Sequence, residues 1–162
     1  MTSTKKARVT LPADTDILIV REFDAPPELV WKAWTTPELI ARWWGAQRGE
    51  ITSVEVDLRV GGSWRYAMDA GGNEVAFRGE YREIDAPQRL VNTEVYEAFP
   101  DAVSVITSTF EAVDGERTRL EQLCSYPSRE VRDMVVASGM EGGMQESMDA
   151  LEEVVVELEA NG

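Results

Sequence analysis

The chain of 162 residues contains no histidine. A Ser-His-Asp triad, a Cys-His pair and any zinc or iron site that uses histidine therefore cannot be assembled from it. The other acid-base side chains form no paired-carboxylate motif, no glycine-rich phosphate loop and no cluster with metal-ligand spacing. The sequence favours a non-catalytic protein with no cofactor and no metal. An enzyme that works through Tyr, Glu or Arg groups stays open as an alternative, because burial can tune such groups.

Cysteine and basic residues are also scarce. Cys124 is the one cysteine, so no internal disulfide can form and a cytoplasmic location is expected. Sixteen Lys and Arg against thirty Asp and Glu give a net charge of −14, which repels nucleic-acid phosphates and anionic lipids. Long apolar runs are missing, and the first ten residues are polar, which argues against membrane insertion and a signal peptide. We therefore expect neither a nucleic-acid partner nor a membrane-inserted segment.

The order of the predicted elements is simple. Residues 1–14 are predicted to be a polar N-terminal tail, and 15–160 a single domain. A β-branched segment at 15–24 predicts a strand, after which Pro27 and Pro37 each begin a short helix, the second ending at Gly45. Six further strand-like segments follow, separated by turn signals. An Asp-Gly turn between the last two indicates an antiparallel sheet.

From Ser128 onward the apolar period changes to that of a long amphipathic helix. Gly139, Gly142 and Gly143 interrupt it, and each glycine inside a helix costs about 1 kcal/mol relative to alanine. They indicate either close packing against a neighbouring strand or a hinge. The predicted fold is α+β, with a curved antiparallel sheet of about seven strands around the C-terminal helix and two short helices after the first strand. The apolar stripe consists of Ala137, Met140, Met144, Met148, Leu151, Val155 and Leu158.

A cavity is expected between the sheet and the long helix, because a strongly bent sheet cannot touch a straight cylinder everywhere. Alternation along the strands predicts which side chains face it. Ser108, Gln122 and Tyr66 either bond one another or water, or orient a polar atom of a ligand. Cys124 is expected to be packed there rather than to act as a nucleophile. The predicted lining is Trp64, Tyr66, Met68, Phe77, Tyr81, Ile106, Ser108, Gln122, Cys124, Met140, Met144 and Met148.

Two adjacent tryptophans, Trp43 and Trp44, close the second short helix in the stretch "LIARWWG". Both indoles fit one broad apolar arc of that helix. They are therefore either ordinary core residues or, in the hypothesis that uses their surplus apolar surface, a lid over the mouth of the cavity opposite the glycines.

Four stretches resemble a known family. They are similar to the bacterial single-domain relatives of the activator of the heat-shock-protein-90 ATPase, in the START-like (SRPBCC) superfamily, which also holds polyketide cyclases and lipid carriers. The resemblance implies the helix-grip fold, also called START-like or Bet v 1-like, with a deep cavity between sheet and helix. The polyketide cyclase branch often uses cavity histidines, which this chain lacks. The stretches are "REFDAPPELVWKAWTTPELIARWWG", "DLRVGGSWRY", "FRGEYREIDAPQRLV" and "YPSREVRDMVVASGMEGGMQESMDALEEVV".

Three functions follow from these observations. The favoured hypothesis is a non-catalytic carrier or sensor that binds a small apolar molecule, such as a lipid-, aromatic- or polyketide-like compound, in the cavity. One alternative is a histidine-independent enzyme of the cyclase or lyase type. The other, which rests on the resemblance alone, is a protein that docks on a chaperone. A monomer and a homodimer are both compatible with the sequence.

Overall fold

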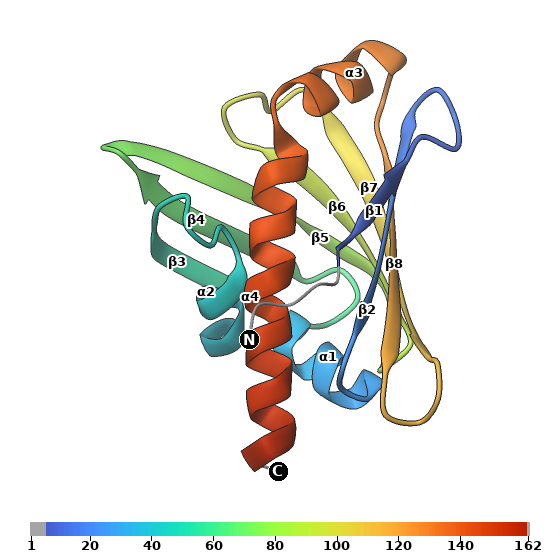
Figure 1. Ribbon diagram of the computed structural model, residues 1–162. Helices are drawn as coiled ribbons and strands as arrows, with labels where there is room; N and C mark the ends of the chain where they lie inside the picture. The colour runs from blue at the N-terminus through green and yellow to red at the C-terminus, as the bar shows by residue number, and fades with distance from the viewer. Residues whose placement is uncertain (1–5, 162) are drawn as a thin grey trace.

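The computed structural model describes residues 6–161 and confirms the α+β architecture (Figure 1). One antiparallel sheet of eight strands curves around a long C-terminal helix. The strands are β1 (Arg8–Thr10), β2 (Asp16–Phe23), β3 (Glu50–Val56), β4 (Ser63–Ala70), β5 (Asn73–Asp85), β6 (Arg89–Tyr96), β7 (Val103–Ala112) and β8 (Thr118–Ser125). The helices are α1 (Pro27–Thr35), α2 (Pro37–Trp43), α3 (Arg129–Ala137) and α4 (Met140–Asn161).

The strand order is β1-β2-β8-β7-β6-β5-β4-β3. Strand β2 pairs with β8 over its whole length, so the start of the domain is joined to its last strand. Alternate residues of β2, among them Ile17, Ile19 and Phe23, are buried on the inner face, the face that looks toward α4. This period of two is the signal that predicts a half-buried strand.

Strand β1 lies in the segment that the sequence analysis assigns to a polar tail. It pairs with β2 through Arg8, Val9 and Thr10. The backbone of Ala7 is also held by the Gln145 side chain of α4, which accepts from the Ala7 N–H at 3.1 Å and donates to its carbonyl at 2.8 Å. A three-residue edge strand with one apolar side chain carries too little periodicity to be read from sequence. The sheet therefore has eight strands and not seven.

The predicted long helix is divided in two. Gly139 has a φ of 82° and separates α3 from α4, because a left-handed residue ends an α-helix and glycine adopts that conformation without strain. Ala137, the first member of the predicted stripe, is consequently exposed on α3, whereas Met148, Leu151 and Val155 of α4 are buried as expected. The stripe is correct only from Met140 onward.

Helices α1 and α2 fill the inner face beside the C-terminal half of α4 (Figure 1). Their starts at Pro27 and Pro37 agree with the prediction. Trp34 stacks on Trp43 with ring centroids 5.0 Å apart, and both Trp31 and Trp34 make edge contacts with Phe110 of β7. This cluster of large rings joins both short helices to the sheet, so this half of the inner face is closed.

Helix α4 carries acidic residues and no basic ones, and arginines from three other elements hold it. The buried Arg21 of β2 donates to Asp149 at 2.9 Å, while Arg42 pairs with Glu157 and Arg48 with Glu146. The two exposed pairs contribute little to stability. The three pairs join α4 to other parts of the chain at Glu146, Asp149 and Glu157. Within residues 6–161, no helix combines the length and apolar character needed to cross a membrane.

Strands β4, β5 and β6 approach one another closely at Gly79. The Trp64 indole N–H donates to the Thr93 carbonyl at 3.1 Å, across the position of Gly79. A Cβ atom at Gly79 would lie 1.9 Å from that same carbonyl oxygen and 2.7 Å from the indole nitrogen. Because the nearest atom belongs to the backbone, the strands themselves would have to shift.

Replacing Gly79 by alanine is therefore expected to lower the free energy of unfolding by about 1–3 kcal/mol or more. Gly143→Ala, within helix α4, is the matched control. A Cβ atom there would lie 3.8 Å from Arg48, which is an ordinary van der Waals contact. This substitution should raise the free energy of unfolding by up to about 1 kcal/mol. Urea unfolding of both variants checks this. Equal effects of the two substitutions would contradict the close approach at Gly79.

Candidate functional site

The candidate site lies on the inner face beside the N-terminal half of α4, where α1 and α2 do not reach. Three aromatic residues meet there. Trp44 makes edge contacts with Tyr66 of β4 at 5.5 Å and with Phe77 of β5 at 5.9 Å between ring centroids. All three are half-buried, whereas Trp31, Trp43 and Phe110 of the neighbouring cluster are buried. We call Trp44, Tyr66 and Phe77 the aromatic wall.

Further rings and hydroxyl groups extend the aromatic wall. The Tyr66 ring lies 4.7 Å from that of Trp64, and Phe77 stacks on Tyr96 at 5.1 Å. The Tyr66 hydroxyl donates a hydrogen bond to Tyr81. Burial is the largest cause that raises the pKa of Tyr66 well above its usual value and that of Tyr81 to about 12. Both tyrosines are therefore neutral hydrogen-bonding groups at physiological pH.

Glu94 of β6 brings a carboxyl group to this inner face. It shares its side of the strand with the core residue Leu90, whereas Thr93 and Val95 point to the outer face. Part of the residue stays accessible to solvent, yet protein surrounds the carboxyl, and this desolvation raises its pKa from 4.5 to about 7. Among the described residues, none forms an ion pair with Glu94.

The charge of Glu94 acts on groups from several strands. After burial and nearer neighbours, it contributes to the raised pKa of Tyr66 on β4, of Cys124 on β8 and of Tyr126 just beyond β8. Tyr126 also donates a hydrogen bond to the Cys124 sulfur. The carboxyl of Glu94 therefore lies among neutral hydroxyl and thiol groups, which can bond to it but cannot neutralise it.

Helix α4 supplies the opposite wall. Met140 and Met144 are half-buried against the core, and Met148 is buried. The loop between α2 and β3 is fastened to the same helix, since the Gly45 N–H donates to Ser147 Oγ at 3.2 Å and Arg48 pairs with Glu146. A Cβ at Gly142 would lie 3.0 Å from the Arg48 guanidinium. Gly142 and Gly143 thus leave room for the Arg48 side chain. The alternative that they allow close packing against a neighbouring strand is wrong.

The paired tryptophans separate at the end of α2. Trp43 is buried and donates from its indole to the Ala33 carbonyl at 2.9 Å, so it is a core residue. Trp44 has an extended backbone, with φ −67° and ψ 133°, and leaves the helix. Placing both indoles on one helical arc was wrong, because α2 ends at Trp43 rather than at Gly45. The loop that follows the two tryptophans does reach Gly142, through the Arg48 side chain.

The remaining predicted residues lie deeper on the same face. Met68, Tyr81, Ile106 and Cys124 are buried, and Gln122 is half-buried beside Ser108 on the neighbouring strand. Ser108 is fully buried, and its hydroxyl has no hydrogen-bond partner among the described residues. Of the two alternatives for Ser108, Gln122 and Tyr66, mutual bonding is not seen for Ser108, and Tyr66 bonds to Tyr81 instead; binding of a ligand atom stays a prediction.

Sequence reasoning did not select Glu94. It stands in the strand "RLVNTEVY", where the alternation places Leu90, Asn92 and Glu94 on one side. A charged residue in a strand is usually assigned to the solvent face, and Val91, Thr93 and Val95 offer an equally good apolar side. Only the pairing of Asn92 with Ile106 and Tyr81 identifies which side faces α4.

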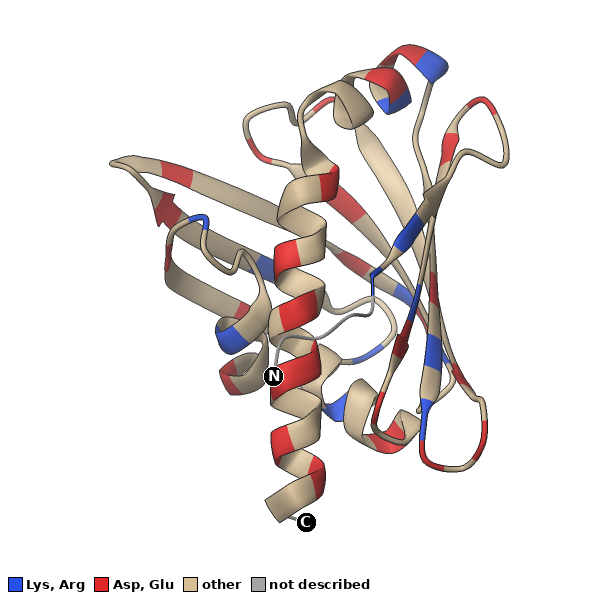
Figure 2. Ribbon diagram, in the orientation of Figure 1, with Lys and Arg blue, Asp and Glu red and all other residues tan. Residues whose placement is uncertain are grey.

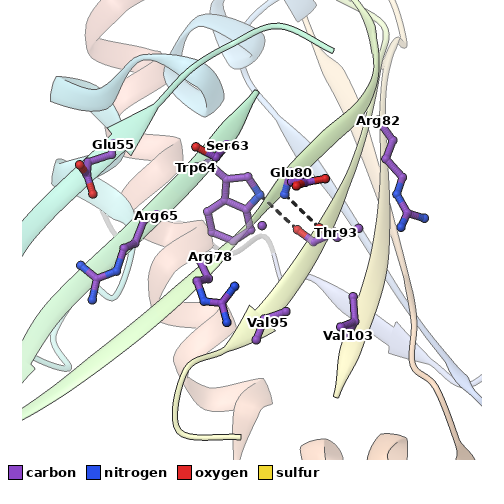
Figure 3. Close-up of a pocket in the computed structure, with 11 residues that line it drawn as sticks. Glu55, Ser63, Trp64, Arg65, Arg78, Glu80, Arg82, Thr93, Val95 and Val103 are labelled. Carbon is purple, nitrogen blue, oxygen red and sulfur yellow. Dashed lines mark hydrogen bonds between the residues drawn. The ribbon is translucent and has the colours of Figure 1, made fainter. Parts of the chain in front are cut away.

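The outer face of the sheet carries a groove of about 510 Å³ (Figure 3). Arg65, Arg78 and Arg82 line it together with Glu55 and Glu80. Arg65 is already bound to Glu97, with nitrogen-oxygen distances of 2.7 and 3.0 Å. A second hollow of about 430 Å³ lies between the start of α1 and strand β7. The outer groove has mixed charge and is separate from the inner face, whereas Phe110 of the inner-face cluster also lines the second hollow.

A family model matches residues 24–156, under the description activator of Hsp90 ATPase homolog 1-like protein. The chain belongs to this family. Members of this START-like family share the helix-grip arrangement described above, so the predicted family and fold are both confirmed. No curated protein matches the chain.

Solved structures agree with this assignment. A crystal structure of a protein from Rhodobacter sphaeroides is 26% identical, covers 93% of this chain and 99% of that chain, and has a TM-score of 0.86. A protein from Mycobacterium smegmatis is 28% identical over 91% of this chain and 94% of that chain, with a TM-score of 0.81. A solution structure from Arthrobacter aurescens is 28% identical over 93% and 91%, also with a TM-score of 0.81.

In the described part of the chain, no three His, Cys, Asp or Glu side chains gather in a way that could hold an ion. The chemistry of the inner face is that of aromatic rings, thioethers, neutral hydroxyl groups and one carboxyl. Such a set can bind an organic molecule through apolar contact and orient it through one or two polar groups.

The raised pKa of Glu94 predicts a pH-dependent loss of stability. In the unfolded chain the group titrates near 4.5, so between pH 4.5 and about 7 the folded protein binds more protons than the unfolded one. This group therefore lowers the free energy of unfolding as pH rises through that range, by up to about 3 kcal/mol. Glu94→Gln should remove this contribution, which urea unfolding between pH 5 and 8 measures. Parallel profiles of the two proteins would contradict it.

Cys124 is expected to react slowly in the folded protein. Burial raises the pKa of its thiol far above the usual value, so the reactive thiolate is scarce at neutral pH. Alkylation by iodoacetamide at pH 7.5 should be at least about tenfold slower than in urea-unfolded protein. A rate equal to that of the unfolded chain would show that the inner face is open at Cys124.

Proposed function

We propose that the protein binds a small, largely apolar molecule between the inner face of the sheet and the N-terminal half of α4, as a carrier or sensor. The observation that supports this most is the half-buried aromatic wall of Trp44, Tyr66 and Phe77, which lies on the same inner face as the Glu94 carboxyl. On the other half of the same face Trp31, Trp43 and Phe110 are buried, because α1 and α2 pack over them there.

The surrounding side chains suit such a role. Aromatic surface that stays accessible to solvent is stabilised when an apolar ligand covers it. Met140 and Met144 on the opposite wall have flexible thioether side chains, which adapt to the shape of a ligand. Membership of the family is compatible with ligand binding. A cytoplasmic location remains our proposal, on the ground that a single buried thiol fits a reducing compartment.

A second candidate function is docking on a protein partner such as a chaperone, as the description of the family suggests. The outer groove favours it, because this acidic chain gathers three arginines there beside the exposed Val103. Such a groove of mixed charge suits a polar segment of a partner. The two functions use opposite faces of the sheet, so variants can separate them.

Dye binding tests the first function. The uncharged dye N-phenyl-1-naphthylamine should bind the native protein and quench tryptophan fluorescence, because Trp44 lies in the wall. Phe77→Ala and Trp44→Ala should each weaken binding by at least about tenfold, as the loss of a large ring contact implies. Arg78→Ala, which changes the next residue of β5 on the outer face, is the control and should leave the affinity unchanged.

Trp43→Ala completes this experiment. It should lower the free energy of unfolding by about 3–5 kcal/mol, because it removes a buried ring, and change dye affinity little. If Arg78→Ala weakened the dye as much as Phe77→Ala, the dye would be bound at the outer groove. If the native protein did not bind the dye, the proposed function would be wrong.

A further inference from the structure

The polar centre of the proposed site defines the class of ligand. This step rests on the proposed function, since it concerns the same inner face. We infer that Glu94 is the anchor for a protonated amine, so that the ligand is an apolar organic cation whose ammonium group lies between the Glu94 carboxylate and the rings of the aromatic wall. Three independent features of the structure support this assignment.

The first feature is the placement of positive charge. Arg21 lies on this face and Arg48 beside it, and both pair with carboxylates of α4: Arg21 with Asp149, and Arg48 with Glu146. Arg65 and Arg78 belong to the outer groove and pair with Glu97. Within residues 6–161, the carboxyl of Glu94 thus has no cation to offset its desolvation, and a ligand that brings one would supply the missing partner.

The second feature is the kind of side chain around the carboxyl. Aromatic rings attract cations through their negative faces, by about 0.5–2 kcal/mol per ring. Tyr66 links the two parts of the site. It belongs to the aromatic wall, and the charge of Glu94 contributes to the raised pKa of its hydroxyl. Phe77 adds a second ring, stacked on Tyr96 of the same strand as Glu94. Rings that share one face of the sheet with a carboxylate are a suitable arrangement for an ammonium group.

The third feature is the field around the site. Figure 2 shows acidic residues along the exposed side of α4, with no basic residue on this helix. Together with the net charge of −14, they raise the local concentration of cations and lower that of anions. A carboxylate or phosphate ligand would be repelled by this field and by Glu94 itself, and the inner-face Arg21 is already paired with Asp149. An anionic ligand is therefore disfavoured.

Two probes of nearly equal shape test the inference. 1-Naphthylmethylamine is a cation at pH 8, and 1-naphthalenemethanol is its neutral counterpart. Isothermal titration calorimetry on the full chain at pH 8 should find the amine bound at least about tenfold more tightly, because it forms a charge-assisted hydrogen bond. Glu94→Gln should remove this preference while the alcohol keeps its affinity within about threefold.

Glu80→Gln is the control, because Glu80 is an exposed carboxylate on the outer face of β5 and changes the net charge equally. It should leave the preference for the amine intact. Equal binding of both probes to the native protein, or an amine preference that Glu94→Gln leaves unchanged, would overturn the inference and leave the proposed function standing. If neither probe bound, the proposed function would fail with it.

Discussion

The packing of α1 and α2 against the concave sheet is the constraint on which the rest of the architecture depends. Trp31, Trp34, Trp43 and Phe110 close one half of the inner face, so α4 is firmly seated along its C-terminal half. At its other half the helix contacts the loop between α2 and β3 and the chain just before β1. There the aromatic wall of Trp44, Tyr66 and Phe77 stays half-buried above a buried layer, and this division separates structural packing from the candidate site.

Glu94 gives this site its chemical character. A carboxyl group on an apolar face without a facing cation is costly, and a chain selected only for stability would carry glutamine or an apolar residue there. Such costs are typical of functional sites, where a partner offsets them on binding. The arginines of this protein are used instead to fix α4 and to line the outer groove, which leaves the inner carboxyl available.

The sequence predicts the family, the order of elements and the inner-face alternation of β4, because period and proline positions are local signals. The sequence does not predict features that depend on contacts between elements far apart in the chain. The left-handed Gly139 divides the last helix, the three-residue β1 depends on β2 and Gln145, and Trp44 leaves α2 to meet Tyr66. Glu94 was missed because the choice between two faces of β6 is made by strand pairing, which a single sequence does not contain.

The most direct test of this account is the titration of the Glu94 carboxyl itself. NMR of protein labelled with carbon-13 at glutamate carboxyls, with Glu94 assigned by its loss in Glu94→Gln, follows this group alone. The account predicts a pKa near 7 in the free protein, as desolvation requires, and a clear fall when 1-naphthylmethylamine is bound, because an adjacent cation favours the carboxylate. A free-protein pKa near 4.5 that the amine leaves unchanged would contradict it.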